Sequence, residues 1–123
     1  MYNRVMIIDD SAMDLLNSRI SISESNFAET VLVQNTAAGA LNYLEMGDDL
    51  PEVIFLDINM PGLSGFDFLR EFSKLDIAVR TQCKVVMLSS SSSKEDIQTA
   101  EADMHVNRYI VKPLHASNLF TIN

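Results

Sequence analysis

Short apolar runs recur along this chain, and they limit the folds it can adopt more than any other feature. The runs are rich in β-branched residues, and the first, third and fourth are continuous, which is typical of strands buried on both faces, as in a parallel sheet. The fifth run is shorter and fits a strand at the edge of a sheet. The predicted strands are Arg4–Ile8, Thr30–Val33, Val53–Leu56, Lys84–Leu88 and Arg108–Val111.

Stretches with helical spacing separate these runs, and most begin at a residue suited to capping a helix. Three of them start with a serine that an aspartate follows three residues later, which is the pattern of a capping box. In the first stretch Met13, Leu16 and Ile20 recur at helical spacing, so we expect them on one face. The predicted helices begin at Ser11 (with Asp14), Thr36, Ser64 (with Asp67), Ser93 (with Asp96) and about His115.

The alternation of strands and helices predicts an α/β fold with the element order (βα)₅. Right-handed crossovers place the helices on both faces of a doubly wound, five-stranded parallel sheet. A chain of 123 residues fits one domain, so residues 1–123 are predicted to form a single unit. Ligands of such open sheets bind outside the carboxyl ends of the strands, near the point where the strand order reverses.

Charge and hydropathy exclude several classes of function. Nine basic and seventeen acidic residues give a formal net charge of −8, which disfavours direct binding to DNA or RNA because that binding depends on Lys and Arg. The apolar runs are far shorter than the about 20 residues that span a membrane. The N-terminus does not resemble a signal peptide, so we expect a cytoplasmic protein.

Polar residues of particular types follow four of the five predicted strands. Asp9 and Asp10 end the first, Asp57 ends the third, Ser89 ends the fourth and Lys112 follows the fifth. An isolated residue of any of these types is usually a turn former, a helix cap or a surface charge. Together they predict a site at one edge of the sheet, where the carboxyl ends of parallel strands meet.

Three carboxylates at one edge of the sheet call for a cation. Two unit charges about 4 Å apart repel by about 4 kcal/mol at an effective dielectric constant of about 20. Oxygen ligands without histidine or cysteine suit Mg²⁺, with Mn²⁺ as the alternative. Such an ion keeps coordination positions that phosphate oxygens commonly fill.

The residues at the predicted site resemble those of a known family in order and in spacing. The matching positions are Asp9-Asp10, Asp57-Ile58-Asn59-Met60-Pro61-Gly62, Gly65, Ser89 and Tyr109-Ile110-Val111-Lys112-Pro113. They resemble the receiver domain of two-component response regulators, of which the single-domain chemotaxis regulators are the simplest members. The resemblance covers nearly the whole chain and implies a flavodoxin-like fold.

The resemblance also implies how the site works. Asp57 would accept the phosphoryl group, and Mg²⁺ would be held by Asp9, Asp10, Asp57 and the backbone carbonyl of Asn59. The chain would take its phosphoryl group from the phosphohistidine of a sensor histidine kinase or of a phosphotransfer protein. It would then act as a switch and not as an enzyme, apart from its own phosphorylation and slow dephosphorylation.

Three further positions have roles that the resemblance implies. Ser89 would bind a phosphoryl oxygen, Lys112 would pair with another, and Tyr109 would be the aromatic residue that switches conformation. The Lys112–Pro113 bond would be cis. The switch would signal to a downstream partner or output domain through the face formed by the fourth helix, the fifth strand and the last helix. A phosphorylation-dependent dimer is also compatible with the resemblance.

Two other functions compete with this interpretation. A metal-dependent phosphatase with an aspartyl nucleophile needs a second aspartate two residues after the first, and that position is Asn59. A receiver-like binding or dimerisation module without phosphorylation would not need the full set of acidic, hydroxyl and lysine residues. Dinucleotide and P-loop sites are excluded because neither glycine motif follows the first strand. Whether the 123 residues are a stand-alone regulator or part of a longer protein stays open.

Overall fold

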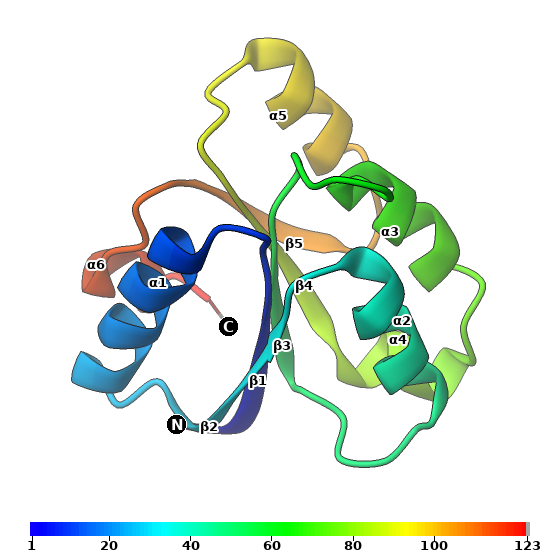
Figure 1. Ribbon diagram of the computed structural model, residues 1–123, viewed down its shortest axis with the longest axis horizontal. Coiled ribbons are helices and arrows are strands. Elements are labelled where there is room, and N and C mark those ends of the chain that lie inside the picture. Colours follow the sequence, from blue (N-terminus) through cyan, green and yellow to red (C-terminus); the bar gives the residue numbers. More distant parts are fainter. Residues whose placement is uncertain (123) are drawn as a thin grey trace.

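The computed structural model describes residues 1–122, which form one five-stranded parallel sheet with helices on both faces (Figure 1). The strand order is β2-β1-β3-β4-β5, so the predicted α/β fold is confirmed. The strands are β1 (Tyr2–Ile8), β2 (Ala28–Gln34), β3 (Val53–Leu56), β4 (Lys84–Ser89) and β5 (Val106–Val111). The helices are α1 (Ala12–Glu24), α2 (Ala37–Glu45), α3 (Gly65–Phe72), α4 (Ile77–Gln82), α5 (Lys94–Glu101) and α6 (Ala116–Leu119).

Alternate side chains of the central strands enter two separate cores, one on each face of the sheet. On one face Ile54 and its strand neighbours pack against α2, α3, α4 and α5, whereas on the other face Phe55 and its neighbours pack against α1 and α6. Figure 1 shows α1 and α6 together on one side of the sheet and the other helices on the opposite side. Because both faces are covered, β3 in the middle of the sheet is apolar and buried at every position.

The order of the strands reverses between β1 and β3, and this reversal sets the place of the site. The chain runs from β1 to β2 on one side and then crosses to β3 on the other side of β1. Asp9 follows β1 and Asp57 follows β3, so both residues lie at the carboxyl ends of two adjacent strands. This is the position where ligands bind in doubly wound sheets.

The helix α4 was not predicted, and it is an addition to the regular (βα)₅ alternation. It spans Ile77–Gln82 between α3 and β4. Within this short helix Val79 is buried, whereas Ile77 is 70% exposed. Six residues with one buried side chain carry too little periodicity to be distinguished from a loop in the sequence.

The predicted apolar face of α1 is wrong. Met13, Leu16 and Ile20 are 67%, 55% and 45% exposed, whereas Ser18 and Ile22 are buried against the sheet. A second stripe with helical spacing runs along α1. It contains Ser18 and Ile22, has fewer apolar residues than the first stripe, and faces the core. Spacing alone therefore could not select the buried stripe.

The three predicted capping boxes differ in how completely they form. The box of Ser64 and Asp67 is complete, with both reciprocal hydrogen bonds present. In α1 the hydroxyl of Ser11 accepts from the backbone N–H of Asp14, but the Asp14 carboxylate does not return to the backbone of Ser11. The aspartate at the same position of α5 likewise turns to another partner. The two carboxylates released in this way are available for contacts elsewhere.

The start of α3 is packed directly against the end of β3. The backbone N–H of Gly65 donates to the carbonyl of Ile58 at 2.8 Å. A methyl group at Gly65 would overlap the backbone carbonyl of Asp57 and would lie 2.9 Å from the Cα atom of Ile58. Glycine at this position therefore lets α3 approach the loop that carries Asp57.

Among the helices of residues 1–122, none combines the length and the apolar character that crossing a lipid bilayer requires.

Candidate functional site

An acidic group lies at the carboxyl ends of β1 and β3. Carboxylate oxygens of Asp9, Asp10 and Asp57 all lie within 4.8 Å of one another. Asp9 and Asp57 are only 1% and 6% exposed, whereas Asp10 is open to solvent. The structure thus brings together the three carboxylates that the sequence places at this edge of the sheet.

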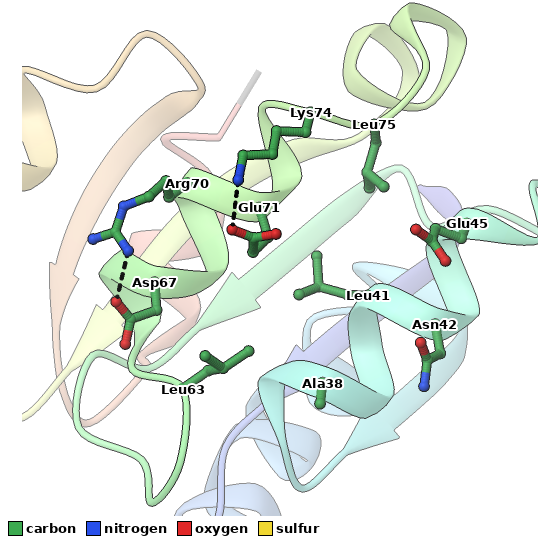
Figure 2. Close-up of a pocket in the computed structure, with 10 residues that line it drawn as sticks. All are labelled: Ala38, Leu41, Asn42, Glu45, Leu63, Asp67, Arg70, Glu71, Lys74 and Leu75. Carbon is green, nitrogen blue, oxygen red and sulfur yellow. Dashed lines mark hydrogen bonds and ion pairs between the residues drawn. The ribbon is translucent and has the colours of Figure 1, made fainter.

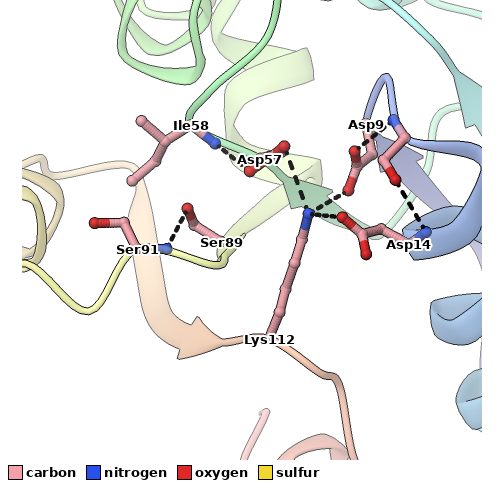
Figure 3. A network of polar contacts seen from close by, with 8 residues as sticks. Asp9, Asp14, Asp57, Ile58, Ser89, Ser91 and Lys112 are labelled. Carbon is pink, nitrogen blue, oxygen red and sulfur yellow. Dashed lines mark hydrogen bonds and ion pairs between the residues drawn. The ribbon is translucent and has the colours of Figure 1, made fainter.

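The ammonium group of Lys112 reaches into the acidic group from the end of β5 (Figure 3). Its Nζ atom lies 2.7 Å from Asp9 Oδ2, 2.8 Å from Asp14 Oδ2 and 3.5 Å from Asp57 Oδ2. The peptide bond between Lys112 and Pro113 is cis. Lys112 therefore connects the end of β5 to the ends of β1 and β3 and to the first turn of α1.

Burial and the neighbouring charges alter the ionisation of the two central groups. Burial raises the pKa of Asp57 above the usual value of an aspartate, and the charge of Asp9 raises it further, whereas Lys112 acts in the opposite direction. Burial acts to lower the pKa of Lys112, but its hydrogen bonds to Asp14 and Asp9, together with the negative charges of Asp57 and Asp9, outweigh burial, and the net pKa is raised. Lys112 therefore stays charged at neutral pH, as a counter-ion of the acidic group must.

The two oxygens of Asp57 have different surroundings. Oδ1 accepts a hydrogen bond of 2.8 Å from the backbone N–H of Ile58, and Oδ2 faces Lys112. These contacts fix the orientation of the carboxylate at the end of β3. A buried and oriented carboxylate has the properties of a nucleophile for an activated phosphorus atom.

The donor set fits Mg²⁺ or Mn²⁺. The acidic group of Asp9, Asp10 and Asp57 offers oxygen ligands alone, which these hard cations prefer. Asp14 adds a fourth carboxylate nearby, and the single ammonium of Lys112 balances one of these four negative charges. Three negative charges remain uncompensated, so a bound divalent ion would offset much of the repulsion between the carboxylates.

Ser89 and Tyr109 are connected through the loop after β4. Ser89 is fully buried at the end of β4, and its hydroxyl accepts from the backbone N–H of Ser91 at 3.2 Å. The Tyr109 hydroxyl, which comes from β5, donates to the backbone carbonyl of Ser91 at 2.8 Å. Ser91 therefore links the two residues for which the family resemblance implies a role in switching.

Asn59 lies two residues after Asp57 in the loop between β3 and α3, and it is exposed. Its position next to the acidic group is compatible with a backbone ligand. That the backbone carbonyl of Asn59 binds the metal remains a prediction.

Sequence reasoning missed two residues that contact this site. Asp14 was interpreted as part of a capping box, and Ser91 was given no role. Asp14 lies in the first turn of α1, four residues after Asp10, and this short distance from the acidic pair was the available signal. For Ser91 the contact runs through backbone atoms, which residue types do not indicate.

A second hollow, between α2 and α3, lies away from this chemistry (Figure 2). Apolar side chains line it, and two ion pairs along α3 border it. These residues are Leu41, Leu63 and Leu75, with the pairs Asp67–Arg70 at 3.2 Å and Glu71–Lys74 at 3.0 Å. The charged residues of α3 are thus paired with each other or with Lys74 just beyond the helix, and none of the residues of the acidic group lines this hollow.

Comparison with known proteins agrees with the geometry of the site. A family model described as the response regulator receiver domain matches residues 5–122. The chain is 25% identical to the chemotaxis protein CheY of Bacillus subtilis, over 97% of this chain and 92% of CheY. It is 36% identical to the transcriptional regulatory protein MctR of Rhizobium johnstonii, over 79% of this chain but only 42% of MctR. A two-component response regulator from Cytophaga hutchinsonii has a crystal structure with a TM-score of 0.87 and 30% identity, covering 97% of this chain and 94% of that one.

The chain belongs to the response regulator receiver domain family of two-component signalling. Phosphorylation and dependence on Mg²⁺ are general properties of this family. The acidic group of Asp9, Asp10 and Asp57 fits such a magnesium and phosphorylation site.

Proposed function

We propose that Asp57 is the residue of this receiver domain that accepts the phosphoryl group. The observation that supports this most is its position: a buried carboxylate at the reversal of strand order, within 4.8 Å of Asp9 and Asp10 and 3.5 Å from Lys112. Phosphoryl transfer to a carboxylate requires an oriented nucleophile, acidic ligands for a metal ion and a positive side chain. Asp57, the pair Asp9 and Asp10, and Lys112 supply these three groups. The proposed receiver domain comprises residues 1–123.

Mg²⁺, or Mn²⁺ in its place, would be held by the side chains of Asp9, Asp10 and Asp57 and by the backbone carbonyl of Asn59. When bound, the ion supplies positive charge that offsets the repulsion between Asp57 and an anionic phosphoryl donor. The residues of the chain do the rest. They orient the Asp57 carboxylate and hold Lys112 beside it.

In the transfer itself, an oxygen of Asp57 forms a bond to phosphorus while the bond between phosphorus and the donor's imidazole nitrogen breaks. The electron pair of that bond stays with the imidazole, and the product is an acyl phosphate. Lys112 would pair with one phosphoryl oxygen, and the Ser89 hydroxyl would donate to another. The donor would be the phosphohistidine of a sensor histidine kinase or of a phosphotransfer protein.

The signal would pass from Ser89 to Tyr109. Ser91 donates to the Ser89 hydroxyl through its N–H and accepts from Tyr109 through its carbonyl. When Ser89 turns toward a phosphoryl group, the backbone of Ser91 has to adjust, and the hydrogen bond of Tyr109 adjusts with it. This chain of contacts supports Ser89 and Tyr109 as the switch residues.

The output surface would be the face formed by α5, β5 and α6, toward which Tyr109 in β5 transmits the change. A downstream protein, an output domain or a second phosphorylated copy would bind there. The formal net charge of −8 argues against direct binding to nucleic acid. The chain would act in the cytoplasm as a switch, and its catalysis would be limited to its own phosphorylation and slow dephosphorylation.

Incubation with acetyl phosphate tests the proposed function. With Mg²⁺ the intact mass is expected to increase by one phosphoryl group, and without divalent metal the increase should be lost. A metal-dependent phosphatase would instead release phosphate from a phosphomonoester over many turnovers. A binding module of the same fold would show no mass increase under either condition.

Lys112→Ala is expected to preserve phosphorylation but to weaken the switch. The acidic residues that would hold the metal remain, whereas the charge that ties the modified site to β5 is gone. We expect NMR shift changes around Tyr109 and α5 that are much smaller than in the wild-type protein. Lys74→Ala is the matched control, because Lys74 is 65% exposed and pairs with Glu71 on α3. Full wild-type shift changes in Lys112→Ala would disprove the proposed role of Lys112.

A further inference from the structure

The ammonium of Lys112 is held more closely by Asp14 than by Asp57. The distance from Nζ is 2.8 Å to Asp14 Oδ2 but 3.5 Å to Asp57 Oδ2. Lys112 also pairs with Asp9 at 2.7 Å, so its three N–H donors face three carboxylates (Figure 3). In this conformation the ammonium is drawn toward the side of the site that α1 and β1 form.

The Asp14 carboxylate binds Lys112 in place of completing the capping box of its own helix. Asp67, at the same position in α3, completes its capping box with the backbone N–H of Ser64. In α1 the corresponding N–H of Ser11 donates to Asp9 Oδ1 at 2.9 Å, and the Asp14 carboxylate is left for Lys112. The contact joins residues 98 positions apart in the sequence.

We propose that Asp14 is a positioning residue that competes with the phosphoryl group for Lys112. Its carboxylate holds the ammonium on the α1 side of the site and so opposes the phosphorylated state. This inference rests on the proposed function of Asp57 and Lys112. It adds a residue that sets how readily the switch is turned on.

Asp14 is the competitor that persists when the site is loaded. A cation bound by Asp9 would take an oxygen that Lys112 now contacts, and phosphorylation would remove the charge of the Asp57 carboxylate itself. Asp14 has no place in the acidic group of Asp9, Asp10 and Asp57, so its attraction for Lys112 stays unchanged. The new phosphoryl group then has to draw Lys112 away from Asp14.

The exposure of the two side chains sets how strongly the Asp14–Lys112 ion pair can oppose phosphorylation. The side chain of Asp14 is 37% exposed, whereas that of Lys112 is 11% exposed. A partly exposed ion pair of this kind changes an equilibrium by about threefold to fivefold. Removing the Asp14 charge should therefore favour the phosphorylated state by about that factor.

Beryllofluoride binding with saturating Mg²⁺ tests the proposal, because this anion forms a stable mimic of an aspartyl phosphate. Asp14→Asn is expected to bind beryllofluoride about threefold to fivefold more tightly than the wild-type protein. In the Lys112→Ala background the same substitution should change the affinity by less than about twofold, because the residue through which Asp14 acts is absent. Asp67→Asn is the matched control, since it removes an aspartate at the same position of another helix and should leave the affinity unchanged.

Three results would overturn the inference. They are an unchanged affinity in Asp14→Asn, a weaker affinity, and an equal gain in both the wild-type and the Lys112→Ala backgrounds. The last result would mean that Asp14 acts by its charge alone and not through Lys112. If the wild-type protein itself does not bind beryllofluoride, the proposed function fails. If the wild-type protein binds beryllofluoride and any of the three results is found, the proposed role of Asp14 fails while the proposed function stands.

Discussion

Asp57→Asn is expected to abolish stable phosphorylation by acetyl phosphate. The substitution keeps the size of the side chain but removes the nucleophilic oxygen, and an amide cannot form the acyl phosphate. No other carboxylate of the acidic group has the same surroundings. Asp57 is buried, with Oδ1 held by the N–H of Ile58 and Oδ2 facing Lys112, whereas Asp10 is exposed and Asp9 already binds Lys112 and Ser11.

The measurement is the intact mass after incubation with Mg²⁺ and the donor. Asp76→Asn is a suitable control, because Asp76 precedes α4 without a capping hydrogen bond from its side chain and lies outside the acidic group. It should be phosphorylated as the wild-type protein is. Stable uptake of one phosphoryl group by Asp57→Asn at the wild-type rate would show that another residue is the acceptor.

Replacing Asp9 and Asp10 together by asparagine is expected to weaken Mg²⁺ binding at least tenfold. A tenfold loss corresponds to about 1.4 kcal/mol, a modest amount for two carboxylate ligands. The substitution removes two of the three charges in the acidic group and also frees Lys112 from its pair with Asp9. The freed ammonium can then approach Asp57, which opposes metal binding further.

Calorimetry, or NMR shifts on titration with Mg²⁺, measures this affinity. Replacement of the adjacent acidic residues Asp48 and Asp49 by asparagine is the control, because it changes the net charge equally in the loop before β3, whereas Asp57 follows β3 at the opposite end of the strand. Its affinity should stay close to that of the wild-type protein. If Asp9→Asn/Asp10→Asn kept the wild-type affinity, the metal would have to bind elsewhere.

The sheet was predictable because burial on both faces leaves a direct mark in the sequence. A strand such as β3, covered on both sides, has no polar position, so its four residues form a continuous apolar run that Asp57 ends. Parallel strands then bring their carboxyl ends to one edge, and the residues that follow them meet there. The predicted strands are all present, and four of the five extend beyond their predicted ends.

Helix faces were less predictable, because spacing on a helix does not state which side is buried. In α1 three apolar residues, Met13, Leu16 and Ile20, share one stripe, yet the buried stripe contains Ser18 and Ile22. The short helix α4 carries one buried residue and therefore no periodic pattern. Both features depend on how the helices pack against the sheet.

Within the site, the sequence indicated which residue types converge but not how they pair. The resemblance implied that Lys112 pairs with an oxygen of the phosphoryl group, and the ammonium does lie 3.5 Å from Asp57 Oδ2, but its shorter contacts are with Asp9 and Asp14. Asp14 has the spacing of a capping residue relative to Ser11, so the sequence offered a local explanation for it. Only the position of β5 relative to α1 shows the contact across the site.

Chemical trapping of the modified residue tests the central claim most directly. The wild-type protein is phosphorylated with acetyl phosphate and Mg²⁺, reduced with borohydride and digested, and its peptides are sequenced by mass spectrometry. Reduction converts an aspartyl phosphate to homoserine, so the account predicts homoserine at position 57 and aspartate at positions 9, 10 and 14. Homoserine at any of those three positions, with aspartate retained at 57, would contradict it.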